Sequence, residues 1–409
     1  MNLENYYKRL PVVDNILLSK TSDKYCMMSP THPPHFKYAS RLMSTIEKFL
    51  TNIDEKPFFV LDTKDQEKNF CVSVNCNKIE LLFLQTLLKE HKNYFQSSNI
   101  DLKKGKLGLP VPDSSKYYSG KLGPNDNDII ENISTQTTTW TRRYQILKKW
   151  LGVHHLWLKR GCKITWVMDS ESVFIRKLDF KNFVHSFDVT PWLNVWPSVL
   201  PHVKNKIPRC WGNIGYGNST SMHIFMGVSP EKWDITKACN YSRPYYEDLW
   251  LYDGNIINDL LKHLEKVHYP RSITNLILNF EHGMQGEYHY YGNWILMKKF
   301  TTDDYYYKRY ILQNLIDELY TKHYFIYKKS INKKILPNTM SGFIKDALHY
   351  NKDWAKIIVP IMNNMKWINF LGWRNQLWNK LDILCTHKWN GSVCFSNCEF
   401  SPHYCSQLT

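Results

Sequence analysis

The acidic segment around residue 169 has the residue types best suited to chemistry. Asp169 and Glu171 follow the apolar run Ile164–Met168 and are separated by one residue. In an extended chain, residues two apart point the same way, so both carboxylates can face one ligand. Mg²⁺ and Mn²⁺ prefer such oxygen ligands and often share their coordination with substrate phosphates. The pattern predicts a divalent-metal site that neutralises a phosphate leaving group, and the alternative is a solvated acidic turn.

Two further apolar runs also end in polar residues. Tyr25–Met28 leads into Ser29-Pro30-Thr31-His32, and Phe58–Leu61 leads into Asp62. Short apolar runs of this kind are typical of strands that are covered on both faces of a parallel sheet. Because the carboxyl ends of parallel strands meet at one edge, we expect Ser29, Asp62 and Asp169 to lie along that edge.

Apolar residues at helical spacing lie between these runs and predict helices that flank the sheet. They are Tyr38, Leu42, Ile46, Phe49 and Leu50 in one stretch, and Trp140, Tyr144, Leu147, Leu151 and Leu158 in another. The order of strands and helices predicts an α/β fold with an open, mainly parallel sheet.

The segment Trp166–Phe180 resembles the metal-binding element of GT-A-fold glycosyltransferases, which take a sugar from a nucleotide-sugar donor. The likeness lies in the apolar strand, the Asp169-x-Glu171 pair and the apolar continuation that follows. Residues 26–39 resemble the first strand and nucleotide loop of that group, and residues 141–149 resemble the helix before its acidic motif. The resemblance covers roughly residues 20–300 and is closest to bacterial and viral members. Two departures are the Glu at the second acidic position and a long insertion at 97–139.

The resemblance implies a GT-A-like, metal-dependent glycosyltransferase that uses Mn²⁺ or Mg²⁺. Asp169 and Glu171 would hold the ion, and a late histidine, His282 or His289, would complete its coordination. The nucleotide's base and ribose would be contacted by Pro30, Thr31, His32 and Asp62. Lys148 or Lys149 would offset the diphosphate charge, with Asp169 close by. The alternatives are a Pro-rigidified turn, a solvated loop carboxylate and a solvated basic helix face.

An acceptor site needs aromatic planes for sugar rings and a carboxylate base for the acceptor's proton. Residues 241–254 and 191–196 supply aromatic and polar residues together. The alternative for these aromatics is ordinary core packing. The candidate bases, which the sequence does not rank, are Glu281, Asp253, Glu247 and Asp248.

Two segments depart from the strand and helix pattern of the predicted catalytic domain. Residues 97–139 are rich in Gly and Pro and predict an insertion or a lid over the site. Residues 301–409 predict a mostly helical C-terminal extension after the catalytic domain at 20–300. The Cys and His residues near the end of this extension, Cys385, His387, Cys394, Cys398, His403 and Cys405, lack the paired spacing of most zinc sites.

Composition favours an anionic partner, because the chain has 53 Lys and Arg residues but only 37 Asp and Glu residues, which gives a net charge of +16. A nucleotide sugar and a glycan or glycolipid acceptor fit this charge, as does peripheral contact with an acidic membrane surface. We expect no nucleic acid, because the sequence holds no nucleic-acid-binding motif. The N-terminus lacks a signal-peptide core, so we expect a cytoplasmic protein with reduced cysteines. The rival functions are a non-catalytic carbohydrate-binding scaffold and a basic nucleic-acid-binding protein.

Overall fold

A computed structural model gives the fold of two main stretches of the chain and several short pieces. It describes residues 23–97, 141–170, 172–174, 178–189, 195–196, 225–227, 243–244, 250–268, 272–279, 287, 290–292, 294–295 and 370–371. The predicted insertion at 97–139 lies outside this part except for Ser97, and so does the predicted C-terminal extension except for residues 370–371. The Cys and His residues at the C-terminal end also lie outside it.

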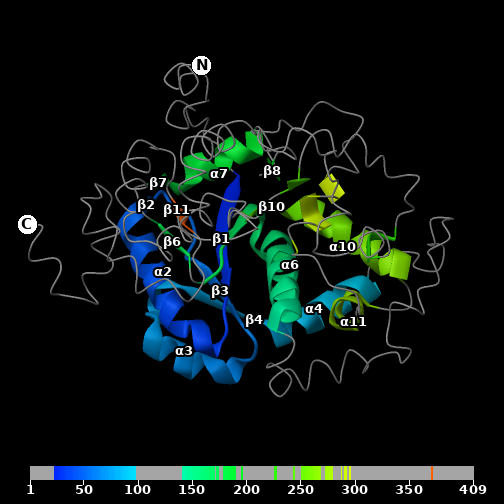
Figure 1. Cartoon of the computed structure of the whole chain (residues 1–409), viewed down its shortest axis with the longest axis horizontal. Coiled ribbons are helices and arrows are strands. Elements are labelled where there is room, and N and C mark those ends of the chain that lie inside the picture. Colours follow the sequence, from blue (N-terminus) through cyan, green and yellow to red (C-terminus); the bar gives the residue numbers. More distant parts are fainter. Residues whose placement is uncertain are drawn as a thin grey trace, which may run out of the picture.

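A five-stranded mixed sheet forms the centre of the fold (Figure 1). In spatial order its strands are β10 (Trp250–Asp253), β5 (Cys162–Val167), β1 (Lys24–Pro30), β3 (Phe58–Leu61) and β4 (Glu80–Phe83). All neighbouring pairs are parallel except β10 with β5, which is antiparallel. The prediction of an α/β class with a mainly parallel sheet is therefore confirmed.

Helices cover both faces of the sheet and bury its apolar residues (Figure 1). One face packs against α4 (Leu84–Ser97), α6 (Thr141–Arg160), α10 (Gly254–His268) and α11 (Ile273–Asn279). The other face packs against α2 (Phe36–Phe49), α3 (Glu67–Ser73) and α7 (Phe180–Val189). The predicted helices match α2 and α6. Three residues of the predicted patterns differ: Leu50 lies in β2, Trp140 lies outside the described residues, and Leu158 is 40% exposed near the end of α6.

Short elements complete the described part. They are the 3₁₀ turns η2 (Pro33–His35), η3 (Lys64–Gln66) and η4 (Cys76–Lys78), and the two-residue strands β2 (Leu50–Thr51), β6 (Val173–Phe174), β7 (Leu178–Asp179), β8 (Val195–Trp196), β9 (Arg243–Pro244) and β11 (Phe370–Leu371). These strands form the pairs β2–β7, β6–β11 and β8–β9. Among the described residues, no helix is long and apolar enough to cross a membrane.

Two disulfides contradict the expectation of reduced cysteines for the four described cysteines. Cys26 in β1 is joined to Cys162 in β5, and Cys71 in α3 is joined to Cys76 at the start of η4. The first bridge spans neighbouring parallel strands whose cysteines are 136 positions apart in sequence. The expectation came from the character of the N-terminus, and sequence spacing alone does not show which distant cysteines become neighbours.

Candidate functional site

The carboxyl edge of β1, β3 and β5 collects the polar residues that the sequence placed at strand ends. Ser29 and Thr31 lie at the end of β1, Asp62 follows β3, and Asp169 closely follows β5. Since these three strands are neighbours and parallel, the prediction of one shared edge is confirmed. The order of the sheet also reverses here, because β3 and β5 lie on opposite sides of β1. Open α/β sheets bind their ligands at such a reversal.

Strand alternation directs both aspartates toward α6. Phe58 and Val60 of β3 belong to the core on the α6 side, as does Val167 of β5. Residues two apart in a strand share a face, so Asp62 and Asp169 continue these two series. Each therefore meets the same helix at the end of its strand.

Lys148 of α6 ties the ends of β1 and β3 together. Its Nζ lies 2.8 Å from Asp62 Oδ1 and donates a hydrogen bond of 2.6 Å to the Thr31 carbonyl oxygen. Asp62 is also fixed by Gln66, which accepts from the Asp62 backbone N–H at 3.1 Å and donates to Asp62 Oδ2 at 3.2 Å. Lys148 and Asp62 are each 2% exposed, so the interpretation of either as a solvated charge is wrong. The pair positions the loops that follow β1 and β3.

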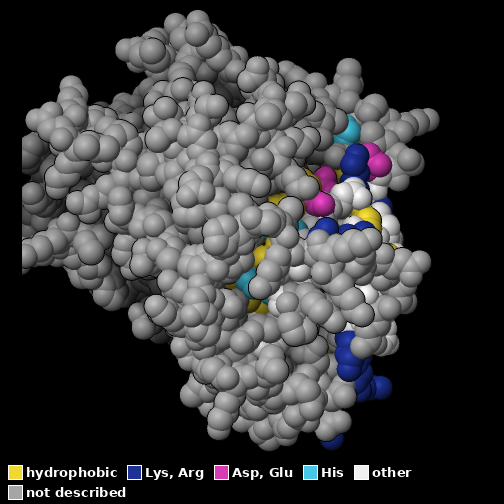
Figure 2. All heavy atoms as spheres, turned by 90° about the vertical axis from the view of Figure 1, so that its right-hand side faces the viewer, with side chains coloured by type: hydrophobic (Ala, Val, Ile, Leu, Met, Phe, Trp, Pro, Cys, Tyr) yellow, Lys and Arg dark blue, Asp and Glu magenta, His cyan; other side chains and the backbone are white. Residues whose placement is uncertain are grey.

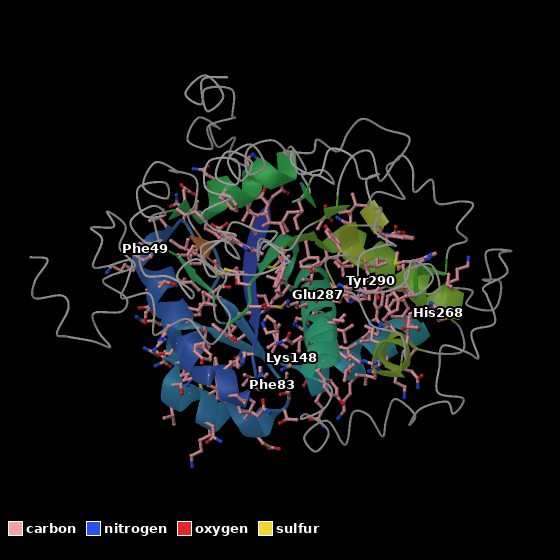
Figure 3. All side chains as sticks on the ribbon, in the orientation of Figure 1. Phe49, Phe83, Lys148, His268, Glu287 and Tyr290 are labelled. Atoms are coloured by element: carbon pink, nitrogen blue, oxygen red, sulfur yellow. A yellow bond between two sulfur atoms is a disulfide. The ribbon has the colours of Figure 1, made fainter. Side chains whose placement is uncertain are left out.

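Lys149, the next residue of α6, forms a second charged cluster at the end of β5. Its Nζ lies 3.0 Å from Asp169 Oδ1 and 2.5 Å from Glu287 Oε1. The same ammonium lies 3.6 Å from the centre of the Trp250 ring, which is a cation–π distance. The Lys149 side chain is 2% exposed and that of Asp169 is 25% exposed, so the carboxylate is the part of this pair that a ligand reaches more easily. In Figure 3, Glu287 is labelled beside α6, the helix that carries Lys148.

Burial changes the proton affinity of two groups on this part of α6. It lowers the pKa of Lys148, and the negative charge and hydrogen bond of Asp62 oppose that change. Burial also raises the pKa of Tyr144, and the charge of Asp62 adds to this effect. Asp62 therefore helps to keep Lys148 charged in an environment that disfavours isolated charge.

Three buried hydroxyl groups at this edge form no hydrogen bond within the described part of the chain. They belong to Ser29, Thr31 and Ser172, which are 2%, 2% and 0% exposed. Ser172 closes the turn after β5, where its N–H donates to the Asp169 carbonyl oxygen at 2.9 Å. Buried polar groups are normally paired, so hydroxyls without partners leave hydrogen-bonding capacity at this edge.

The residues of the predicted nucleotide loop follow β1 as expected, and their contact with a nucleotide stays a prediction. Pro30 ends β1, and the side chain of Thr31 is buried beside it. His32 precedes η2, and its ring lies 3.9 Å from that of His35. The predicted residues Glu171, His282, His289, Glu281, Glu247 and Asp248 lie outside the described residues.

The structure places Asp253, a predicted catalytic base, away from Asp169, because β10 runs antiparallel to β5. Asp253 is level with Ile164, five positions before Asp169, or roughly 16 Å along the strand. Its Oδ1 accepts from the N–H groups of Asn255 and Ile256 and so caps α10. This aspartate stabilises the start of a helix at a distance from the site.

The prediction of an aromatic acceptor platform is wrong for the three aromatic or apolar residues before Asp253. Trp250, Leu251 and Tyr252 form a buried strand and are at most 1% exposed. Trp250 still contributes to the site through its contact with Lys149, which the sequence did not indicate. Glu287 was also missed. A signal for Lys149 was present, because α6 is apolar on nearly all sides from Tyr144 to Leu156, which indicates a buried helix.

The described part of the chain has the architecture of a doubly covered α/β protein with a charged site at the reversal point of its sheet. Comparisons with protein-family models, with curated proteins and with solved structures found no match. Fold and site geometry are therefore the basis for any assignment of function.

Proposed function

We propose that this protein is a GT-A-like glycosyltransferase that moves a sugar from a nucleotide-sugar donor to a glycan acceptor. The observation that carries the proposal is the position of Asp169 at the carboxyl end of β5, where the sheet order reverses. The aspartate follows a buried strand and is partly exposed, as a residue must be to touch a ligand held at this edge. The resemblance of residues 166–180 to the acidic element of such enzymes supports the same position.

Asp169 would supply one carboxylate ligand to a hard divalent ion at this edge. Asp169 already interacts with a cation, the Lys149 ammonium, at 3.0 Å. Mn²⁺ and Mg²⁺ take carboxylate oxygens as ligands. Asp169 would hold the ion, with Glu171 as the sequence-predicted second ligand. When bound, the ion would neutralise the diphosphate that leaves from the sugar.

The residues of the chain would position the donor around this point. Lys149 restrains the Asp169 carboxylate, and Glu287 shares the same ammonium, so the charge of Lys149 is balanced before any donor arrives. The buried ion pair of Lys148 and Asp62 keeps the loops after β1 and β3 in fixed positions. The side chains of Ser29 and Thr31 are buried beside these loops and belong to the packed base of the site.

One observation favours a non-catalytic carbohydrate-binding protein as the rival. Asp62 and Asp169 are both paired with lysines, as they would be in a purely structural network. A nucleic-acid-binding protein is less well supported, because Lys148 and Lys149 are buried and engaged within the chain. Figure 2 shows one face of the molecule, on which the described Lys and Arg side chains occur in separate groups, with acidic side chains near the upper ones.

The proposal is tested with the purified full-length chain and a panel of UDP-, GDP- and CMP-sugars in the presence of Mn²⁺. Release of free sugar measures donor hydrolysis, and calorimetry measures donor binding. Asp169→Asn should reduce hydrolysis at least about 10²-fold, because a charge at the reacting centre is lost. Its melting temperature should fall only moderately, because Glu287 still pairs with the buried Lys149.

Asp65→Asn is the matched control, because it removes the same charge from an exposed position after β3. It should hydrolyse donor at the wild-type rate. Donor binding without hydrolysis for the whole panel would favour the carbohydrate-binding rival. A folded Asp169→Asn protein with wild-type hydrolysis would show that the acidic segment is an ordinary turn.

A further inference from the structure

The two disulfides differ in exposure, in span and in what they hold together. Cys26 and Cys162 are 1% and 0% exposed and belong to the core on the α6 side of the sheet. Cys71 and Cys76 are both partly exposed, and they are only five positions apart. The four cysteines thus form one inner and one outer bridge, Cys26–Cys162 and Cys71–Cys76 respectively.

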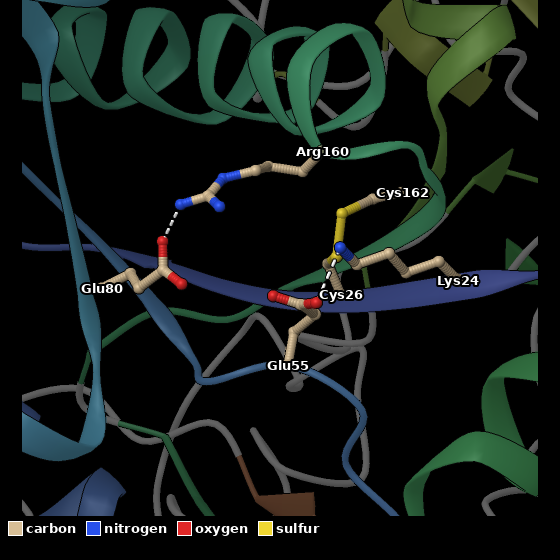
Figure 4. The surroundings of a disulfide bond; sticks show 6 residues. All are labelled: Lys24, Cys26, Glu55, Glu80, Arg160 and Cys162. Carbon is tan, nitrogen blue, oxygen red and sulfur yellow. Dashed lines mark hydrogen bonds and ion pairs between the residues drawn. A yellow bond between two sulfur atoms is a disulfide. The ribbon is translucent and has the colours of Figure 1, made fainter.

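The inner bridge joins the two strands that carry the site. Figure 4 shows it between β1 and the start of β5, with the Lys24–Glu55 ion pair beside it. Thr31 and Asp169 follow the carboxyl ends of the same two strands. A thiol reductant reaches the buried sulfurs only after the core opens, which requires close to the full free energy of unfolding.

The outer bridge closes a small surface loop. Val72, between its cysteines, is 84% exposed, so this part of the chain projects into solvent. Phe70 and Val74 are buried, and the Val74 N–H donates to the Phe70 carbonyl oxygen at 3.0 Å. These contacts anchor the end of α3 without the disulfide. Opening of the outer bridge therefore needs little change in the rest of the fold.

We propose that Cys71–Cys76 is a reversible thiol–disulfide exchange site, whereas Cys26–Cys162 is a permanent cross-link of the site strands. A thiolate of a dithiol reductant attacks one sulfur of the outer bridge, forms a mixed disulfide and releases the other sulfur as a thiolate. The second thiol of the reductant then displaces the protein cysteine. Two protein thiols and one oxidised reductant result, so two electrons pass to the protein and the exchange is balanced. The inner bridge does not take part while the protein is folded.

The test is differential alkylation of the chain, purified without reductant. Folded protein is treated with graded dithiothreitol and labelled with one isotopic form of N-ethylmaleimide. It is then unfolded, fully reduced and labelled with a second form, and peptides are measured by mass spectrometry. The labelled fraction of Cys71 and Cys76 should exceed that of Cys26 and Cys162 at least about tenfold in the folded protein. Both pairs should react alike in guanidinium chloride.

Three results would overturn the proposal: parallel labelling of both pairs in the folded protein, earlier labelling of the inner pair, or free thiols at the inner pair before dithiothreitol is added. Two double variants test the proposal that Cys26–Cys162 is a permanent cross-link and Cys71–Cys76 is not. Cys71→Ser/Cys76→Ser should keep the wild-type melting temperature within a few degrees. Cys26→Ala/Cys162→Ala should melt well below it or fail to fold, whereas equal melting of the two double variants would refute the cross-link role. None of these measurements uses a sugar donor, so they are independent of the proposed transferase activity.

Discussion

Acidification from pH 7 to pH 5 should destabilise the fold through His154, a buried histidine of α6. Its side chain is part of a polar network within the core on the α6 side, where Nε2 lies 3.2 Å from Asn258 Oδ1 of α10. The ring of His91 in α4 lies 6.0 Å from the His154 ring, and His91 itself pairs with Glu265. Burial lowers the pKa of His154 from 6.5 to about 4, and the nearby positive charges of His91, Lys262 and His155 add to the effect.

The size of the effect follows from the two pKa values. The unfolded chain binds a proton at His154 near pH 6.5, and the folded chain binds it only near pH 4. The contribution of His154 to the free energy of unfolding is therefore fully present above pH 6.5 and is lost as the pH falls toward 4. One pKa unit corresponds to about 1.4 kcal/mol, so the complete loss is about 3 kcal/mol. Between pH 7 and pH 5 the loss from this one group is about 2 kcal/mol.

The assay is urea unfolding, followed by tryptophan fluorescence, of the wild type and of His154→Gln between pH 8 and pH 5. Glutamine keeps a donor for Asn258 but does not titrate. At pH 8 the comparison gives the cost of the substitution itself. Below pH 6.5 the stability of the variant should decline less steeply than that of the wild type, by about 2 kcal/mol at pH 5. Equal pH dependence of the two proteins would refute the reasoning.

Three further predictions concern single contacts, each measured as the free energy of unfolding. Lys148→Met should cost about 3–5 kcal/mol because Asp62 remains buried without its partner, and a recovery in Lys148→Met/Asp62→Asn would confirm that cause. Gly254→Ala should cost about 1–3 kcal/mol, since an added Cβ would lie 2.4 Å from Trp157 Cβ; an unchanged midpoint would contradict that clash. Asp253→Ala should cost about 1 kcal/mol through loss of the α10 cap, whereas Asp253→Asn should retain most of the stability.

The parallel strands of the sheet could be predicted from the sequence because their signal is local. Each apolar run of β1, β3 and β5 ends at a polar residue, and strand polarity then requires the polar residues to share one edge. The common direction of Asp62 and Asp169 toward α6 follows from the same alternation. The helical periodicity of α2 and α6 is likewise contained within each segment.

The parts of the site that were missed depend on contacts between distant segments. The position of Asp253 depends on the antiparallel direction of β10, which no local pattern specifies. Glu287 meets Lys149 across 138 positions of sequence. The apolar residues around Lys148 and Lys149 do indicate that this stretch of α6 is buried, yet the charge pattern suggested a solvated face. Burial of a lysine becomes acceptable only when its carboxylate partner is known, and that partner lies on another element.

Lys148 and Lys149 are adjacent, so α6 connects the loops on both sides of the point where the sheet order reverses. Lys148 contacts the loops after β1 and β3, and Lys149 contacts the loop after β5. Because the two lysines are consecutive residues of one helix, a rotation of α6 would change both ion pairs together. The loop after β3 and the loop after β5 are therefore attached to the same helix through neighbouring residues.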